Sequence, residues 1–397
     1  MKICIVCHEY PPNVISGCGT ALTTLASGLT KKGHKLTIIT PLLRTDVREE
    51  QHENLKIIRL PILQSGILSK LNLFDARLAF SLALRRFRKQ FDFTAFDVLH
   101  IYDVHDSYFL NEKILKKIPV IISVNDHYSY ITPWNPLKFP YPTPNLFKRY
   151  LHAQLTKLLN AHYLRKCHAI FTITEYQKEI LSHACKIPRE KMTTIYRGMD
   201  FRRFTRTKNK YQSKKILYIG SNMERKGVAF LIDAMPAILK KFPQASLTII
   251  GKKNAALERK FQKQISQHQL QGNIQMLEYV PSNEIPEYFA EANIFVLPAI
   301  IETLAVTVLE ALTSQTPVVA TRVGGHEEAI TEGSGILIRP GSAKEISTAV
   351  IEIFSHPKKA EEMGKKAARR IQQQFSKEKM IDAVEKCYLR ILPSKKS

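Results

Sequence analysis

The stretch "IIETLAVTVLEALTSQTPVVATRVGG" (residues 300–325) joins an amphipathic segment to a short apolar run. Its apolar spacing predicts a helix over residues 303–313, and "TPVVATR" (316–322) has the length and β-branched content of a buried strand. The same alternation of strand and helix extends in both directions along the chain. Strands that alternate with helices favour parallel sheets covered by helices on both faces.

The expected strands fall into two series. The first contains "KICIVCHEY", "KLTIIT", "LKIIRLPI", "DVLHIYD", "PVIISVND" and "AIFTIT", and the second contains "KKILYIG", "ASLTIIG", "IQMLEYV", "NIFVLPA", "TPVVATR" and "GILIRP". A basic run with few aliphatic residues, 196–215, separates them. We therefore predict an α/β fold of two Rossmann-like doubly wound domains, residues 1–203 and 204–375, which face a cleft. Residues 376–397 are expected to form a helical extension that packs back on the N-terminal domain.

Composition limits the classes of protein. The chain has 397 residues, 44% of them apolar, which suits two globular domains rather than a disordered chain. It has no run of eighteen apolar residues, and its start lacks the pattern of a signal peptide. The six cysteines are scattered, and Cys4 and Cys7 fall in an apolar strand. We therefore expect buried thiols and a cytoplasmic location.

The net charge of +24 is the most unusual bulk property. It favours an anionic partner such as nucleic acid, an acidic membrane or a phosphorylated substrate. A solvated basic surface without a specific partner would have the same composition.

Glu302 and Glu310 are the first candidate site residues. On a helix over 303–313, eight residues rise about 12 Å and turn both carboxylates toward one side. The first turn of that helix would offer free backbone N–H groups to a phosphate, and carboxylates accept hydrogen bonds from hydroxyl groups. Alternatively, Glu302 is a helix cap and Glu310 is a solvated side chain.

The second candidate is the loop in "YIGSNMERKGVAFLIDAM" (218–235). Here a strand ends at Gly220, Arg225 and Lys226 follow, and Gly227 opens a helix. Two cations at this point suit a diphosphate, although loop cations are usually just solvated. The Walker A pattern is absent.

These motifs, in this order, resemble glycosyltransferase family 4, whose members are retaining enzymes of the GT-B fold. The resemblance rests on "GSNMERKG", on the E-x7-E of Glu302 and Glu310, and on "PVVATRVGGHEE". In the first half, "EYPPNVISGCGTALTTLASGLTKKGHKLTIIT" is similar to the opening glycine loop of that family, and "TTIYRGMDFRRF" to the segment that closes its first domain.

The resemblance implies a role for each matched residue. Glu302 would contact the hydroxyls of the donor sugar and Glu310 the ribose. Lys226, with Arg225 beside it, would hold the pyrophosphate and stabilise the leaving nucleoside diphosphate. The remaining donor-binding positions would act through their backbones: Leu304, Ala305 and Val306 by amides that cradle phosphate, and Gly17 and Gly19 by the close approach that glycine permits.

The chain departs from the family at several positions. Ser221 stands where an arginine usually follows the glycine, and Ser16 stands where a first glycine is common. Asn125 replaces a histidine that many members place near the anomeric carbon. Asp126 and His127 follow it, so the catalytic group of the first domain could be any of these three, and His127 could equally be a loop residue without a role.

A metal-free reaction is expected. The chain has no D-x-D pair and no histidine cluster with convincing metal spacing. Fixed cations and a helix N-terminus can stabilise a departing diphosphate instead. We predict no required cofactor and a nucleotide-diphosphate sugar, UDP- or GDP-linked, as the donor.

Two basic segments concern the acceptor. Residues 76–90 and 141–166 each contain five Arg or Lys and no Asp or Glu, and Leu151, Leu155, Leu158 and Leu159 form a helical stripe in the second. Basic amphipathic helices suit the inner face of an anionic membrane. The same leucines could face the core instead. We therefore predict a glycan or lipid-linked acceptor, as in polysaccharide, lipopolysaccharide or glycolipid synthesis.

Other function classes fit the sequence less well than a retaining hexosyltransferase. A sugar-nucleotide epimerase does not call for the E-x7-E. A nucleic-acid-binding protein is disfavoured because no recognition module is present and the basic runs are mixed with leucine rather than aromatic residues. A catalytically silent sugar-nucleotide-binding relative stays open because of Asn125 and Ser221.

Overall fold

The computed structural model describes residues 1–14, 16–43, 45–62, 76–125, 146–204, 211–252 and 255–392. Asp126 and His127 lie outside these ranges, as does the start of the second basic segment. Within the described ranges, no helix has the length and apolar character needed to cross a membrane. The chain forms two compact units, Met1–Gly198 with Lys377–Ser397, and Met199–Ser376.

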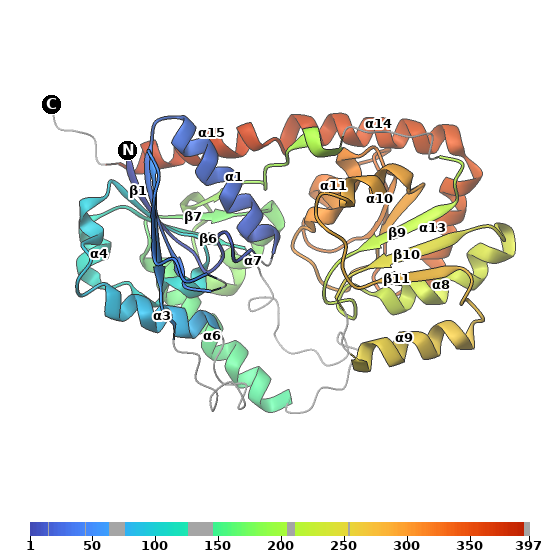
Figure 1. Ribbon diagram of the computed structural model, residues 1–397, viewed down its shortest axis with the longest axis horizontal. Coiled ribbons are helices and arrows are strands. Elements are labelled where there is room, and N and C mark those ends of the chain that lie inside the picture. Colours follow the sequence, from blue (N-terminus) through green and yellow to red (C-terminus); the bar gives the residue numbers. More distant parts are fainter. Residues whose placement is uncertain are drawn as a thin grey trace. The chain divides into compact units, whose positions relative to one another are not determined.

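The first unit contains an eight-stranded sheet of order β3-β4-β2-β1-β5-β6-β7-β8 (Figure 1). All neighbouring strands pair in parallel except β3 with β4. The order reverses between β1 and β5, because the chain builds outward from β1 on both sides. The strands are β1 (Lys2–Val6), β2 (Lys35–Pro41), β3 (Glu49–Gln51), β4 (Leu55–Leu60), β5 (Val98–Ile101), β6 (Val120–Val124), β7 (Ala169–Thr172) and β8 (Met192–Thr194).

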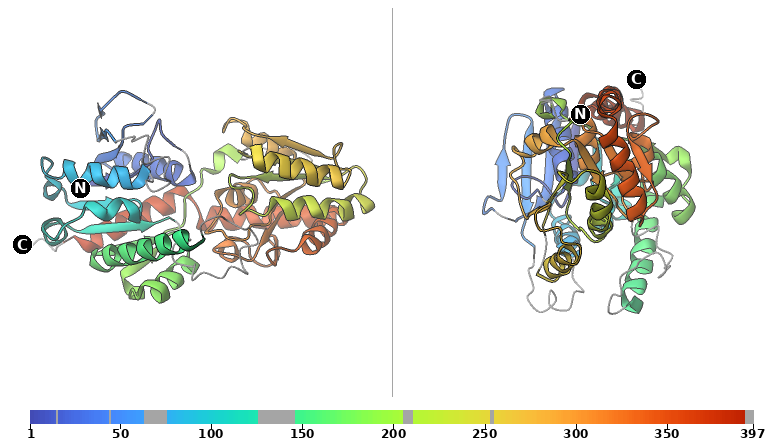
Figure 2. Two further views of the ribbon diagram at one scale, coloured as in Figure 1. Left: turned by 90° about the horizontal axis from the view of Figure 1, so that it is seen from below. Right: turned by 90° about the vertical axis from the view of Figure 1, so that its right-hand side faces the viewer.

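Helices cover both faces of this sheet (Figure 2). One apolar cluster joins α1 and α15 to the first face, and another joins the remaining α-helices to the second. The α-helices are α1 (Gly17–Lys31), α3 (Ala76–Phe87), α4 (Glu112–Lys117), α6 (Leu146–Lys166), α7 (Glu175–Cys185) and α15 (Lys377–Ile391), with 3-10 helices η1 (Phe93–Ala95), η2 (Val104–Phe109) and η4 (Arg189–Lys191).

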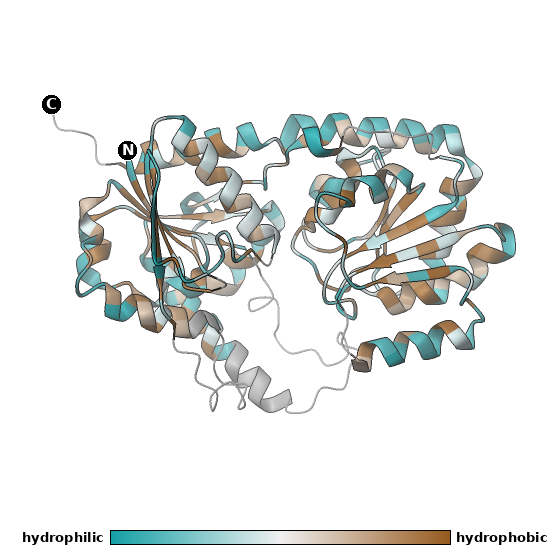
Figure 3. Cartoon of the chain, in the orientation of Figure 1, coloured by the Kyte–Doolittle hydropathy of each residue, from teal (hydrophilic) through white to brown (hydrophobic). Residues whose placement is uncertain are grey.

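The second unit has a six-stranded parallel sheet of order β11-β10-β9-β12-β13-β14, which reverses between β9 and β12. Its strands are apolar, whereas the outer helix α14 is mostly hydrophilic (Figure 3). The strands are β9 (Lys215–Ile219), β10 (Ser246–Ile250), β11 (Ile274–Leu277), β12 (Ile294–Leu297), β13 (Val318–Thr321) and β14 (Ile336–Ile338). The helices are η5 (Phe201–Phe204), α8 (Val228–Lys241), α9 (Ala255–Gln267), α10 (Ile285–Glu291), α11 (Val306–Thr313), α12 (His326–Ala329), α13 (Ala343–Ser355) and α14 (Pro357–Gln374).

The predicted fold class is confirmed, and every expected strand is present. Two local expectations were wrong. The helix expected over 303–313 begins only at Val306, so Glu302 precedes it and the helical spacing of the two glutamates does not apply. Gly17 and Gly19 lie in the first turn of α1 rather than in a loop. All six cysteines are buried free thiols, as expected.

The leucines of α6 do not all face the core. Leu155, Leu158 and Leu159 are 56%, 69% and 41% exposed, whereas Leu164 is fully buried. The core-facing alternative is therefore wrong for these three side chains.

Candidate active site

The candidate site lies where the strand order of the second unit reverses. β9 and β12 are neighbours there, and their carboxyl ends lead into residues 220–227 and 298–305. Loops that leave two neighbouring parallel strands toward opposite sides leave a crevice between them, which is the usual ligand site of such sheets. The topology therefore places the two motifs chosen from the sequence side by side.

Glu302 is the centre of this arrangement, and only 7% of it is exposed. Its Oε1 accepts a hydrogen bond from the Thr303 amide at 3.0 Å. Its Oε2 lies 3.5 Å from Lys226 Nζ and 3.6 Å from Arg225 Nη1. The same Arg225 nitrogen donates to the Ile301 carbonyl at 2.7 Å. A buried carboxylate is costly unless it is paired, and here two cations pair with it.

Glycines let the backbone close around this cluster. Gly227 caps α8 with a φ of +74°, and a Cβ there would overlap the Pro298 carbonyl. Gly324, with a φ of +57°, leaves the same kind of space beside the Glu302 carbonyl. A Cβ at Gly220 would lie 2.9 Å from Cδ of Lys226, so the absence of a side chain at residue 220 gives the lysine its place.

The N-terminus of α11 is open to a ligand. Its N-cap is Ala305, which offers no side chain to the first turn, and that turn contains no acidic residue. Leu304 and Ala305 are buried, and Val306 is the first helical residue. The Oγ1 atom of Thr307, in the same turn, is buried without a hydrogen-bond partner in the described part of the chain. An uncapped helix start with free N–H groups attracts an anion.

Glu310 lies one turn further along α11. Burial raises its pKa to about 7, and the positive charges of Arg203 and Lys226 oppose the shift. Its carboxyl group is therefore poised to gain or lose a proton near neutral pH, and hydroxyl groups that donate to it would favour the ionised form. Ser221, the other predicted donor-side residue, is exposed directly after Gly220.

His326 was not singled out from the sequence, although it stands within "VGGHEE". The ring is fully buried, and its Nδ1 donates to the Thr321 carbonyl at 2.9 Å. Nε2 is buried without a hydrogen-bond partner among the described residues. Burial lowers the pKa of His326, the charge of Glu302 acts against this shift and that of Lys226 adds to it. The sequence signal that could have identified His326 is its position directly after Gly324 and Gly325.

The first unit has its own reversal point, between β1 and β5. Ser16 caps α1 there by accepting from the Cys18 amide at 3.1 Å, and its hydroxyl donates to Glu9 Oε2 at 3.0 Å. A Cβ at Gly19 would lie 3.0 Å from the same Glu9 oxygen. Gly19 thus allows Glu9 to approach the start of α1, and Ser16 has a structural role that explains the departure from glycine.

The reversal point also brings together His8 and Asp106, which follow β1 and β5. His8 Nδ1 lies 3.0 Å from Asp106 Oδ2, and the aspartate is fully buried. Sequence reasoning missed this pair because its members are far apart in the chain. Asn125, at the end of β6, donates from its side-chain amide to the Tyr102 carbonyl. The Asn125 side-chain amide therefore makes a structural hydrogen bond inside the first unit.

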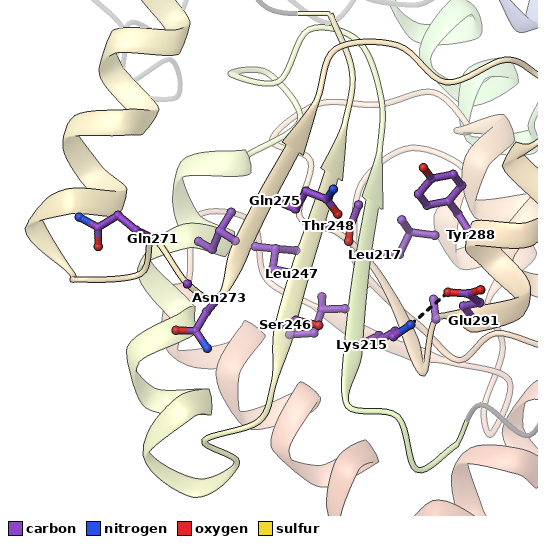
Figure 4. Close-up of a pocket in the computed structure, with 14 residues that line it drawn as sticks. Lys215, Leu217, Ser246, Leu247, Thr248, Gln271, Asn273, Gln275, Tyr288 and Glu291 are labelled. Carbon is purple, nitrogen blue, oxygen red and sulfur yellow. Dashed lines mark hydrogen bonds and ion pairs between the residues drawn. The ribbon is translucent and has the colours of Figure 1, made fainter.

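A separate hollow of about 490 Å³ lies at the amino-terminal ends of strands in the second sheet, opposite to the candidate site (Figure 4). It is lined by the amino-terminal parts of β9, β10 and β11 and by α10, and an ion pair between Lys215 and Glu291 borders it. Because all these strands are parallel, their starts lie away from the carboxyl-end loops that hold Glu302. None of the predicted site residues lines this hollow.

Two protein families match the chain in succession. "Glycosyltransferase Family 4" matches residues 15–203, and "Glycosyl transferases group 1" matches residues 200–370. These matches support a glycosyltransferase of the family 4 type. Within the described residues, no group of three His, Cys, Asp or Glu side chains is placed to hold a metal ion.

Two curated relatives align over most of their length. An uncharacterized glycosyltransferase of Methanocaldococcus jannaschii is 26% identical, with 89% of each chain covered. The alpha-monoglucosyldiacylglycerol synthase of Acholeplasma laidlawii is 24% identical, with 80% of each chain covered.

Solved structures share the fold. Sucrose-phosphate synthase from Thermosynechococcus elongatus matches with a TM-score of 0.78 at 18% identity, over 98% of each chain. Anabaena HepE in complex with UDP-glucose matches with a TM-score of 0.74 at 15% identity, over 98% of this chain and 100% of the other. Like these proteins, the glycosyltransferase described here has the GT-B fold.

Proposed function

We propose that this glycosyltransferase moves a hexose-type sugar, with retention of configuration, from a nucleotide-diphosphate sugar to a hydroxyl of a glycan or lipid-linked acceptor. The observation that carries the proposal is the pairing of Glu302 with Arg225 and Lys226 beside the uncapped start of α11. This cluster combines an acceptor for sugar hydroxyls with cations and amides for a diphosphate. UDP is the favoured nucleotide of the donor because the solved HepE structure contains UDP-glucose, and GDP is the alternative.

In the proposed mechanism, a donor pyrophosphate binds at the amides of Leu304, Ala305 and Val306. Lys226 and Arg225, which already pair with Glu302, then also bind phosphate oxygens. Their positive charge stabilises the diphosphate as it departs. Fixed cations of this kind allow the reaction to proceed without a metal ion. Glu302 accepts hydrogen bonds from sugar hydroxyls and so orients the anomeric carbon, while Glu310 holds the ribose.

We assign the acceptor to the predicted N-terminal domain, residues 1–203, and the donor to residues 204–375. The acceptor is proposed to be lipid-linked or part of an envelope glycan, and one relative is named as a glycolipid synthase. A lipid-linked acceptor would favour a chain that lies in the cytoplasm and attaches to the inner face of an anionic membrane. In the first unit, Asn125, Asp126 and His127 remain the proposed catalytic positions.

Thermal stabilisation by a panel of UDP-, GDP-, ADP- and CMP-sugars tests the donor site. One nucleotide should stabilise the wild type, and Glu310→Ala should lose that shift. Glu332→Ala provides a matched control, because Glu332 is an exposed carboxylate that is not among the predicted site residues. If no nucleotide sugar stabilises the protein, the transferase proposal fails.

A catalytically silent sugar-nucleotide-binding relative is the second candidate, favoured by the use of Asn125 in a backbone contact. Such a protein would show the thermal shift but would neither transfer nor hydrolyse the bound donor. Product analysis after long incubation with that donor separates the two. Release of the free nucleoside diphosphate would support the enzyme, and an intact donor would support the silent relative.

A further inference from the structure

Helix α6 exposes three of its leucines to solvent. Ala161 and Leu164 pack into the core of the first unit, whereas Leu155, Leu158 and Leu159 are 56%, 69% and 41% exposed. At 100° per residue the three exposed leucines fall within about a third of the helix circumference. Single exposed leucines are ordinary on protein surfaces, but three on one face indicate a surface that another apolar medium covers.

The polar residues on the same side of α6 are basic. His162 falls between the leucines in angle, and Lys166 lies one turn further on, and both are exposed. The whole helix, Leu146–Lys166, contains no acidic residue. Lys166 pairs with Glu112 of α4 at 3.2 Å, so the exposed face of α6 is mainly apolar, and the helix carries no negative side chain of its own.

Helix α3 presents a second basic face. Leu82, Arg85 and Arg86 share one side of α3 at helical spacing, Lys89 lies in the turn that follows the helix, and all four are exposed. Arg85 donates to the Tyr108 carbonyl. Neither Arg86 nor Lys89 makes an ion pair within the described part of the chain. The face has the charge that an anionic surface attracts.

The two helices are held together by η2. The Tyr108 carbonyl accepts from Arg85 of α3 at 2.9 Å and from the Tyr163 hydroxyl of α6 at 3.2 Å. The Tyr108 hydroxyl donates to Asn160 of α6 at 2.6 Å. α3 and α6 therefore pack against the same segment of the first unit, and both lie along the lower edge of that unit in Figure 1.

We propose that α6 and α3 form a docking surface for an anionic phospholipid bilayer, with Leu155, Leu158 and Leu159 entering the interface. Arg86 and Lys89 would lie at the level of the lipid phosphates. This combination of apolar anchors and unpaired cations fits a bilayer surface, because a protein partner would have to supply both apolar and acidic groups in matching positions. The inference deepens the proposed membrane attachment and does not require glycosyl transfer.

Flotation of the full-length protein with vesicles tests the proposal. Vesicles of phosphatidylcholine with roughly one-third phosphatidylglycerol should carry the protein at low salt, and phosphatidylcholine alone should carry much less. Raising the salt from roughly 50 to 500 mM should weaken binding, because the Debye length shortens. Replacing Leu155, Leu158 and Leu159 together by Gln should lower the partition coefficient about tenfold or more.

Matched variants separate the surface from general charge and hydrophobicity. Arg86→Gln with Lys89→Gln should weaken binding several-fold, whereas Lys358→Gln with Lys359→Gln on α14 should leave it unchanged. Leu389→Gln replaces a leucine of α15 that is 56% exposed, and it should also have no effect. Stabilisation by the nucleotide sugar should persist in every variant, so a failed membrane surface is distinguishable from a failed donor site.

Three results would overturn the proposal. One is the absence of flotation with anionic vesicles at low salt. Another is equal flotation of the wild type and the triple leucine variant. The third is a wild type that binds no vesicles and has a higher molecular mass in solution than the triple leucine variant. That result would show that a second copy of the chain covers the leucines.

Discussion

Protonation of Glu310 should control how tightly the donor binds. Burial raises the pKa of this carboxyl to about 7 in the free protein. If ribose hydroxyls donate to Glu310, they stabilise the carboxylate and lower its pKa in the complex. The donor then binds the ionised form, and the proton must leave before binding whenever the pH lies below 7.

The magnitude follows from the ionised fraction. With a pKa of about 7, roughly one carboxyl in eleven is ionised at about pH 6 and ten in eleven at about pH 8. The dissociation constant should therefore fall about tenfold between these two pH values, which corresponds to about 1.4 kcal/mol. The sign is definite: affinity rises with pH, because the free protein holds the proton and the complex does not.

Calorimetric titration of the nucleotide sugar that gives the largest thermal shift measures this dependence. The diphosphate of a nucleotide sugar is a diester without ionisation near neutral pH, so the ligand does not contribute to the effect. Glu310→Gln should bind more weakly and show no pH dependence, and Glu332→Gln should behave as the wild type. Constant affinity between about pH 6 and pH 8, or affinity that falls with pH, would refute the role of Glu310.

Three further predictions concern individual residues. Lys226→Met should weaken donor binding about ten- to hundredfold by calorimetry, because a hydrogen bond to a charged group contributes about 1.5–3 kcal/mol, and an unchanged affinity would remove Lys226 from the site. Gly227→Ala should lower the free energy of unfolding by more than about 1–2 kcal/mol in urea titrations, since its φ of +74° disfavours any side chain; Gly272→Ala, with no neighbour near its Cβ position, should be near neutral. Burial lowers the pKa of His100 to about 3, so the stability it contributes is complete above the unfolded pKa of about 6.5 and is lost as the pH falls, by about 1.4 kcal/mol per pH unit. The urea midpoint should drop accordingly, and His100→Gln, but not the exposed His183→Gln, should flatten this part of the profile.

Hydrophobic patterning was sufficient for the architecture of both sheets. Buried parallel strands are continuous apolar runs, and each expected run became a strand. The two strands that were missed, Glu49–Gln51 and Met192–Thr194, are three residues long and lie at sheet edges. Runs this short carry no periodicity, and only tertiary pairing makes them strands.

Local sequence could not fix where α11 begins. "ETLAVTVLEAL" reads equally well as helix from Thr303 or from Val306, because Leu304 and Ala305 are apolar in either case. In the fold, the Thr303 carbonyl accepts from the Gly325 amide at 2.5 Å, and this contact with a distant segment holds the preceding chain extended. A boundary set by a residue more than twenty positions away is outside the reach of a local pattern.

The candidate site shows the same division between topology and contact. A doubly wound strand order is enough to bring the loop with Lys226 next to the loop with Glu302, since both leave neighbouring strands at the reversal point. The corresponding point in the first unit joins His8 to Asp106, yet no motif marked them, because a hydrogen-bonded pair between two loops leaves no regular spacing along the chain. Once the strand order is known, the residues that follow each innermost strand are therefore the ones to inspect, whether or not a motif includes them. Applied to this protein, that rule returns the predicted cations and glutamate of the second unit and adds His8 with its buried partner Asp106 in the first.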